Sequence, residues 1–492
     1  MKRNHLPSSS RTMGGCASAR SLLAALVILS TLWLGGYPAA ARAAPDQGEA
    51  EKSTDERLSR LEEQLRALQL ELVRLRQEKG TNPQRVEALA RQMEALARQL
   101  QILTQELERQ QLGAAYGVAD QSIHGLGPAA SKVYGREQGV SLGGYGEMVY
   151  NNRSSGDDQV DFLRAVFYFG YKFNDRILFN SEIEFEHAKT GEGEDGEVAV
   201  EFAYLDFLVR DGFNVRAGLV LLPVGFLNEL HEPPIFFGAS RPQVERVILP
   251  TTWRESGVGA FGEVGPFSYR VYVLNGLDST GFSASSGLRG GRQDGSKAQA
   301  NDIALAARVD WTMAPGLQVG FSGYLGDSGQ DAEVLGEELE GLVSVFDLHA
   351  EWRWRGLRLR GLYARVDIDD AELINHQNLN ASDGGEKSIG ERLVGWYAEA
   401  AYDVLAHLDT RQQLSPYVRY EEYNTQDKVP DGYLTDPSDP FRADPALDVQ
   451  LLTVGVAFQP IPQVTIKVDF QDFDNQAGTG MDQFNVALGY LF

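Results

Sequence analysis

From about residue 135 to the end of the chain, hydrophobic and polar side chains alternate with a period of two. The clearest stretch is the last one, where Phe484, Val486, Leu488, Tyr490 and Phe492 fall on one face and small or polar residues fall on the other. Successive side chains of a β-strand point to opposite faces, so this pattern predicts strands that are apolar on one face only. The same alternation recurs at 163–173, 213–219, 303–311, 452–458 and 464–470.

The alternation divides this region into sixteen predicted strands, and the connections between them alternate between short and long. Connection 405–414 is the longest member of the short set, and 222–256 is the longest of the long set. An even strand number, with short turns at one end and long loops at the other, is typical of bacterial membrane barrels. The predicted fold class is all-β: a 16-stranded antiparallel transmembrane β-barrel, preceded by an α-helical coiled-coil segment. The predicted strands are 140–150, 160–173, 177–187, 198–209, 213–221, 257–264, 267–275, 301–311, 317–325, 343–354, 357–367, 392–404, 415–423, 448–458, 464–472 and 483–492.

Alternation alone does not tell a membrane barrel from a soluble one, because a soluble barrel turns the same apolar face inward. The N-terminus separates the two cases. Residues 1–20 carry four basic residues and no acid, an apolar run follows at 22–34, and Ala41-Arg42-Ala43 fits a cleavage site. This is the pattern of a secretory signal peptide over 1–43. The chain is therefore expected to be exported.

Before the β region the hydrophobic period is 3.5. Leucines at 58, 61, 65, 68, 72 and 75 form an a/d seam, and a second run in the same phase extends from Val86 to Leu107. Gly80 to Pro83 interrupts the two runs, and Asn82 with Pro83 suits the start of a second helix. Two arrangements fit these runs: an oligomeric stalk and an antiparallel helical hairpin. The stalk is favoured because the second run continues the heptad phase of the first. The predicted domains are the signal peptide (1–43), a periplasmic coiled coil (44–112), a linker (113–134) and the barrel (135–492).

Composition removes several classes of function. The formal net charge is −24, with 45 Lys and Arg against 69 Asp and Glu, which disfavours nucleic acid as a partner. The single cysteine, Cys16, lies inside the predicted signal peptide, so the mature chain has no thiol chemistry. The sequence contains no nucleotide-binding or zinc-protease motif and no spacing typical of a nucleophilic triad. We expect no enzyme activity, no cofactor and no metal site.

Two stretches carry a resemblance to known families. The last strand, which ends on Phe492, resembles the closing strand of bacterial outer-membrane barrels, which implies insertion by the barrel-assembly machinery. Residues 140–492 resemble the phosphate-selective O/P-type porin superfamily, on the stretch from Leu222 to Gly259 that reads LPVG, then NE-x-HEPP, then PTTW-x-E-x-GVG. The resemblance implies a homotrimer whose third long loop, 222–256, folds into the lumen and narrows it. In those porins lysines and arginines line the lumen for phosphate.

The lumen predicted here has mixed charge rather than a lysine ladder. Only six lysines follow residue 135, whereas arginines at inward positions are more numerous and acids accompany them. Mixed signs favour sieving of solutes, and single-sign rings would select ions. For each of these charges, ion pairing within the wall is the competing interpretation. The candidate pore-lining and constriction residues are Arg164, Arg216, Arg270, Arg308, Arg358, Arg360, Arg419, Lys467, Glu182, Glu184, Glu229, Glu232, Arg241 and Arg246.

The sequence thus predicts an outer-membrane porin that passes small hydrophilic solutes or ions, including anions such as phosphate, by passive diffusion. The expected partners are outer-membrane lipid and lipopolysaccharide, two further copies of the chain, and the assembly machinery. The alternative is a structural protein whose periplasmic coiled coil ties the outer membrane to the cell wall, with peptidoglycan as its partner. Single-channel conductance and deletion of the coiled coil distinguish the two.

Overall fold

The computed structural model describes residues 60, 61, 63–71, 74, 84, 85, 87–99, 119, 122–191, 193–379, 389–430 and 443–492. The expected signal peptide, with Cys16, lies outside the described residues, as do the two ends of the expected coiled coil. The chain separates into two compact units, one over Leu26–Gly117 and one that contains Val118–Phe492. Each unit is described by itself.

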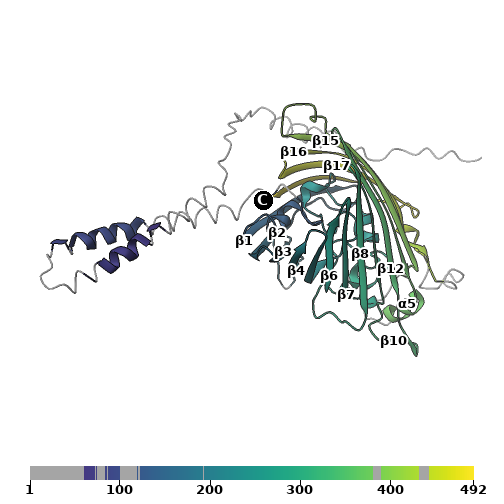
Figure 1. Cartoon of the computed structure of the whole chain (residues 1–492). Helices are drawn as coiled ribbons and strands as arrows, with labels where there is room; N and C mark the ends of the chain where they lie inside the picture. The colour runs from purple at the N-terminus through teal and green to yellow at the C-terminus, as the bar shows by residue number, and fades with distance from the viewer. Residues whose placement is uncertain are drawn as a thin grey trace, which may run out of the picture. The chain divides into compact units, whose positions relative to one another are not determined.

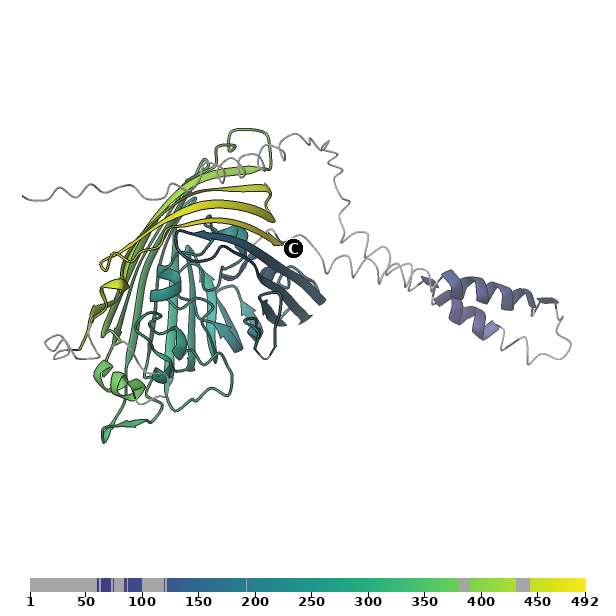
Figure 2. The ribbon, with the colours of Figure 1, turned by 180° about the vertical axis from the view of Figure 1, so that it is seen from behind.

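The described part of the first unit is helical. Residues 60, 61, 63–71 and 74 belong to one helical segment and residues 84, 85 and 87–99 to another. The two segments lie side by side (Figures 1 and 2), and the guanidinium of Arg85 lies 3.8 Å from the carboxylate of Glu71. This contact is the one expected of the helical hairpin, and the oligomeric stalk stays a prediction. None of the described helices is long and apolar enough to cross a membrane.

The second unit contains a closed antiparallel barrel of sixteen strands, which confirms the predicted fold class (Figure 1). Each strand pairs with its neighbours in the chain, except that β9 pairs with β12 and β1 closes the ring on β18. A separate two-stranded hairpin, β10 (Glu333–Val334) and β11 (Glu337–Glu338), lies in the connection between β9 and β12. The barrel strands are β1 (Gly139–Arg153), β2 (Gln159–Asn174), β3 (Ile177–Glu186), β4 (Val198–Arg210), β5 (Phe213–Leu221), β6 (Arg254–Val264), β7 (Phe267–Asn275), β8 (Ile303–Ala314), β9 (Leu317–Gly326), β12 (Val343–Trp354), β13 (Leu357–Ile368), β14 (Arg392–Tyr402), β15 (Gln413–Lys428), β16 (Asp448–Ile461), β17 (Val464–Asn475) and β18 (Gln483–Leu491).

Short elements occupy the segment before β1 and the longer connections. Helix α4 (Pro128–Ser131) precedes β1, and α5 (Ala371–Leu379) follows β13. Five short helical turns complete the described elements: η1 (Pro233–Ile235), η2 (Val244–Ile248), η3 (Ser279–Gly281), η4 (Arg289–Gly291) and η5 (Pro445–Leu447). One end of the barrel carries the short turns and the other carries the long loops, as predicted. We call these the turn end and the loop end.

The barrel turns its apolar side chains outward. Large hydrophobic residues on nearly every strand expose a third to more than half of their surface, whereas their polar neighbours are buried inside. Soluble proteins rarely expose contiguous apolar surface of this extent, and membrane barrels present it to lipid. Outward residues include Phe167, Phe169, Val258, Val273, Leu305, Val309, Phe321, Leu348, Val418, Val454, Leu488 and Phe492.

A β-bulge explains why strand 198–209 does not alternate cleanly. The register of β3 on β4 shifts between Glu182 and Ile183, which pair with Phe202 and Val200. Glu201 is the extra residue, so both Glu201 and Phe202 are buried inside. In β13 the alternation is regular, and Arg360 points inward. Arg365 falls on the opposite face, where it is half-exposed and pairs with Asp367 at 2.6 Å.

Candidate functional site

The connection between β5 and β6, residues 222–253, runs through the interior of the barrel (Figure 2). Inward side chains of distant strands hold its backbone there. On β17, Asp469 accepts a hydrogen bond from the Ala239 amide at 2.6 Å, and Lys467 donates to the Gly238 carbonyl at 2.9 Å. Lys467 also lies over the Phe236 ring, 3.5 Å from its centre. These bonds anchor one flank of the segment on the wall.

The other flank is tied to β12 and β14. The Gly225 amide donates to Asp347 at 3.0 Å. The carboxylate of Glu245, in η2, accepts from the amides of Phe226 and Leu227 at 2.6 and 2.7 Å and from the Tyr397 hydroxyl at 2.6 Å. Gly225 has φ +61°, and a Cβ there would lie 2.7 Å from Glu245, so glycine is required at this turn.

The residues before β1 also lie inside the barrel. Leu126 and Ala129 are buried, and the amides of Ala129 and Ala130 donate to Glu232 at 3.0 and 3.2 Å. From the wall, the Asn180 side chain donates to the Ala130 carbonyl at 2.9 Å. We call residues 122–135 the N-terminal plug. They include all described residues of the expected linker except Ala119, so this part of the linker is a packed element.

Further along the N-terminal plug, Tyr134 reaches the wall. Its hydroxyl donates to Asp206 on β4 and accepts from Arg216 on β5 at 2.9 Å. Arg216 pairs with Asp206 at 2.8 Å and lies over the Tyr204 ring. The N-terminal plug thus covers the inner wall from β1 to β7 at the turn end.

Ion pairs also line the wall on β7, β8 and β12. Asp310 on β8 accepts from Arg270 at 2.7 Å, from Arg308 at 2.8 Å and from His349 at 3.0 Å. Glu351 on β12 is shared by three guanidiniums. Such pairs hold the wall rigid, and buried ones are costly to break.

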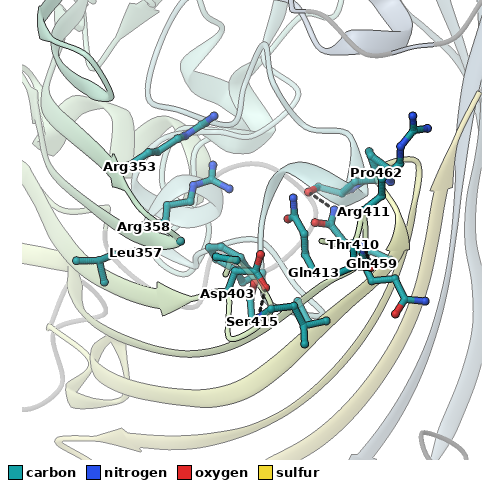
Figure 3. Close-up of a pocket in the computed structure, with 18 of the residues that line it drawn as sticks. Arg353, Leu357, Arg358, Asp403, Thr410, Arg411, Gln413, Ser415, Gln459 and Pro462 are labelled. Carbon is teal, nitrogen blue, oxygen red and sulfur yellow. Dashed lines mark hydrogen bonds between the residues drawn. The ribbon is translucent and has the colours of Figure 1, made fainter. Parts of the chain in front are cut away.

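Three cavities that described residues line bear on function. The first, about 650 Å³, is at the turn end between β12 and β17 (Figure 3). The second, about 640 Å³, is at the loop end and is lined by residues of β1, β2, β17 and 239–252. Phe236 lines both, so the segment between β5 and β6 separates them. The third, about 220 Å³, is lined by His124 of the N-terminal plug together with β6 to β9.

The fourteen sequence-predicted residues divide between these cavities and the packed wall. Arg164, Arg241 and Arg246 line the loop-end cavity, Arg358 lines the turn-end cavity, and Arg270 and Arg308 line the third. Eight others line none of the three cavities. They are Arg216, Arg360, Arg419, Lys467, Glu182, Glu184, Glu229 and Glu232, and all are buried.

Most of the buried residues have named partners. Arg419 pairs with Glu421 at 2.8 Å and Arg360 with Glu351 at 2.7 Å. Arg164 lies 3.1 Å from Glu184. Two further acids are paired: Glu182 lies 3.1 Å from His231, and Glu229 lies 3.4 Å from Arg270.

The sequence interpretation missed cavity residues that follow no strand period. Arg411 lies on the turn between β14 and β15, Arg289 begins η4 in the connection between β7 and β8, and His124 lies in the N-terminal plug. Alternation identifies inward residues of strands only. The one available signal was the length of the 405–414 connection.

Burial shifts the pKa of several interior groups that lie outside the strands. Burial raises the pKa of Glu232 to about 8, against the lowering effect of the two amides, and the charge of Glu182 raises it further. Burial, with the charges of Arg292 and Arg246, lowers the pKa of Arg289 to about 10. Among the residues that the structure describes, no group of three His, Cys, Asp or Glu side chains converges on a metal site.

Comparison with known proteins identifies one relative and several solved structures. An uncharacterised protein of Aquifex aeolicus is 39% identical over 378 residues, which cover 75% of this chain and 83% of that protein. No protein-family model matches the chain.

The similar solved structures are outer-membrane proteins at low identity. Salmonella typhi OmpF, solved in complex with daunomycin, is 15% identical, with a TM-score of 0.48 over 72% of this chain and 98% of that one. A loop-deletion mutant of Vibrio cholerae OmpT is 14% identical, with a TM-score of 0.46 over 73% and 100%. An anion-selective porin from Comamonas acidovorans is 13% identical, with a TM-score of 0.44 over 72% and 100%.

Proposed function

We propose that this chain, which belongs to the same family as the uncharacterised Aquifex aeolicus protein, is an outer-membrane porin that passes small hydrophilic solutes by diffusion. As the sequence predicts, we also propose that the chain forms a homotrimer and is a member of the phosphate-selective O/P-type porin superfamily. The coiled coil would lie in the periplasm.

One observation carries the proposal: the barrel is apolar outside, and inside it holds two large polar cavities at opposite ends. An apolar belt on a closed sixteen-stranded sheet suits a lipid bilayer. A barrel of this strand number is wide enough to hold an aqueous passage. Water on the inside and lipid on the outside are what a diffusion channel requires.

The constriction of this passage would lie at Phe236. The ring lines both cavities, and the neighbouring backbone is bonded to Lys467 and Asp469 on the wall. A solute that moves between the two cavities must pass this point, so the segment between β5 and β6 would set the size limit.

The cavities favour anions although the whole chain is strongly acidic. The loop-end cavity is lined by five arginines and three carboxylates: Arg153, Arg164, Arg241, Arg246 and Arg289 against Glu147, Asp161 and Glu186. The turn-end cavity is lined by four arginines and one carboxylate. An excess of one sign along a pore selects ions of the opposite sign. We therefore expect the channel to prefer anions.

Reconstitution of the full mature chain in planar bilayers tests this function. We expect discrete conductance steps, and a reversal potential in a salt gradient that reports a preference for chloride over potassium. Phe236→Ala should raise the conductance by widening the constriction, whereas Phe321→Ala, on the lipid-facing surface, should leave it unchanged. A barrel that inserts without conducting would contradict the proposal.

A further inference from the structure

The turn between β14 and β15, residues 403–412, is longer than the other connections at the turn end and forms one side of the 650 Å³ cavity (Figure 3). Its conformation is fixed from within. The Asp403 carboxylate accepts from the amides of Leu405 and Leu414 at 3.0 and 3.1 Å. Asp403 is the one carboxylate among the described residues that line this cavity, and backbone amides of the turn and of β15 engage it.

The facing side of the cavity has an excess of positive charge. Arg353, Arg358 and Arg360 all donate to the single carboxylate of Glu351. Arg358 also lies over the Phe237 ring, with its guanidinium carbon 5.2 Å from the ring centre. One of its terminal nitrogens, Nη2, is buried and has no hydrogen-bond partner. Arg360 also faces Glu399 across the β13–β14 pair, but Arg353 and Arg358, which line the cavity, share Glu351 as their one ion-pair partner among the described residues. One shared carboxylate leaves donors and positive charge on this wall for an incoming anion.

The side formed by the turn carries a second positive group. Arg411 lies across the cavity from Arg353 and Arg358, beside Gln413 (Figure 3). Arg411 is exposed, and no described carboxylate forms an ion pair with it. Amide and hydroxyl groups of Gln412, Gln459 and Ser415 add neutral hydrogen-bonding capacity between the two sides.

We propose that this cavity is a binding site for small organic dianions, with one carboxylate at Arg358 and the other at Arg411. Guanidinium groups bind carboxylates through paired, charge-assisted hydrogen bonds. A site with one such group on each side favours a ligand with a charge at both ends over one with a single charge. This site rests on the proposed porin function and names a class of solute for it. The cavity would hold the dianion beside the constriction before or after the solute passes through.

The test uses the full chain with succinate as the probe, and acetate and neutral succinamide as matched probes. Binding is measured by calorimetry on the protein in detergent, and separately as interruption of the chloride current in planar bilayers. We expect succinate to bind and to interrupt the current, acetate to do so at least about ten-fold more weakly, and succinamide not at all.

Variants locate the site. Arg411→Gln and Arg358→Gln should each weaken succinate binding by about ten-fold or more. Arg176→Gln, on the exposed turn between β2 and β3 at the same end of the barrel, is the matched control and should leave the affinity unchanged. Arg411 is exposed, so its substitution does not disturb the packing of the wall.

The outcomes separate the two proposals. A chain that binds succinate but never conducts would refute the porin and leave the site. A chain that conducts without binding succinate would refute the site and leave the porin. Equal loss of binding in Arg411→Gln and Arg176→Gln, or equal affinity for succinate and acetate, would also refute the two-ended site.

Discussion

At the scale of single residues, the interior is held by carboxylates that each accept from several donors. Asp310 is the clearest case, since two guanidiniums and the His349 ring converge on its two oxygens. His349 in turn contacts Asp347 at 2.6 Å, so the network continues to the next acid. Because these groups are shielded from water, the loss of one member leaves its partners buried and unpaired.

Asp310→Asn should therefore destabilise the barrel strongly. Removing one partner of a buried ion pair costs about 3–5 kcal/mol, because the remaining charge stays buried. The free energy of unfolding in urea, measured in lipid vesicles, should fall by that order. Asp211→Asn, on the exposed turn between β4 and β5, should change it by less than about 0.5 kcal/mol. If Asp310→Asn lowered the free energy of unfolding as little as Asp211→Asn does, the Asp310 network would contribute nothing to stability.

Glu232 should make the docking of the N-terminal plug depend on pH. Burial raises the pKa of this carboxyl from its usual 4.5 to about 8, so docking favours the neutral form. Its contribution is complete below pH 4.5 and is lost as the pH rises through about 8. Hydrogen-exchange protection of the Ala129 and Ala130 amides, corrected for intrinsic rates, should fall between pH 6 and 9.

Glu232→Gln is the matched control for this effect. The glutamine keeps an oxygen acceptor for the two amides and does not titrate in this range. Protection in the variant should stay flat from pH 6 to 9, and an unchanged pH dependence would assign the effect to another group.

At the scale of elements, the ring is closed between β1 and β18, where glycines face aromatic rings. Gly144 exchanges backbone hydrogen bonds with Phe492 at 3.1 and 2.9 Å. A Cβ on Gly144 would lie 2.3 Å from the Val166 carbonyl and 2.7 Å from the Phe492 ring. On Gly146 it would lie 2.4 Å from the hydroxyl of Tyr490. The absence of a side chain at Gly144 and at Gly146 therefore leaves space for the rings of Phe492 and Tyr490.

Gly144→Val should prevent this closure. The added side chain meets backbone on the neighbouring strand, which cannot move without breaking the ladder. The shift in gel mobility between heated and unheated samples, which reports a closed barrel, should be lost. Gly361→Ala should retain it, because the nearest atom to its Cβ would be at an ordinary 3.4 Å. A closed Gly144→Val barrel would contradict the steric argument.

The strands could be predicted from the sequence because a period of two needs only local information. Inward positions such as Arg308 and Arg419 follow from that period, and the structure buries both. The bulge at Glu201 could not be predicted, because it depends on register with β3. Nor could the N-terminal plug, whose small side chains carry no period and whose anchor, Glu232, lies 103 residues from Ala129.

At the scale of the whole molecule, charge is distributed unevenly. The chain carries a net charge of −24, yet arginines outnumber acids in the lining of both large cavities. Some inward arginines pair within their own strand, as Arg419 does with Glu421. Others pair across strands or with an inner segment, as Arg216 does with Asp206 and Arg270 with Glu229, so the charge balance at those points of the lumen depends on tertiary structure. For this reason the sequence alone does not decide whether the channel has the proposed preference for anions.

Deletion of 55–112 tests whether the helical unit serves assembly while the barrel alone conducts. If the helical unit only organises the oligomer, the variant should lose cross-linked trimers and keep its conductance per barrel. Cross-linked trimers that persist would assign assembly to the barrel surface. Membrane blebbing in cells that carry the variant would support the structural alternative, in which this unit reaches the cell wall.

The enclosed N-terminal plug also bears on biogenesis. Residues 122–135 come shortly before β1, yet they lie inside the ring that β1 completes with β18. This segment is synthesised before any strand, whereas the ring closes only on the last strand. If the ring closed first, the segment would have to enter through the turn end of the finished barrel. Docking before closure would avoid that step, and the barrel-assembly machinery expected from the last strand would then have to keep the sheet open until the segment is in place.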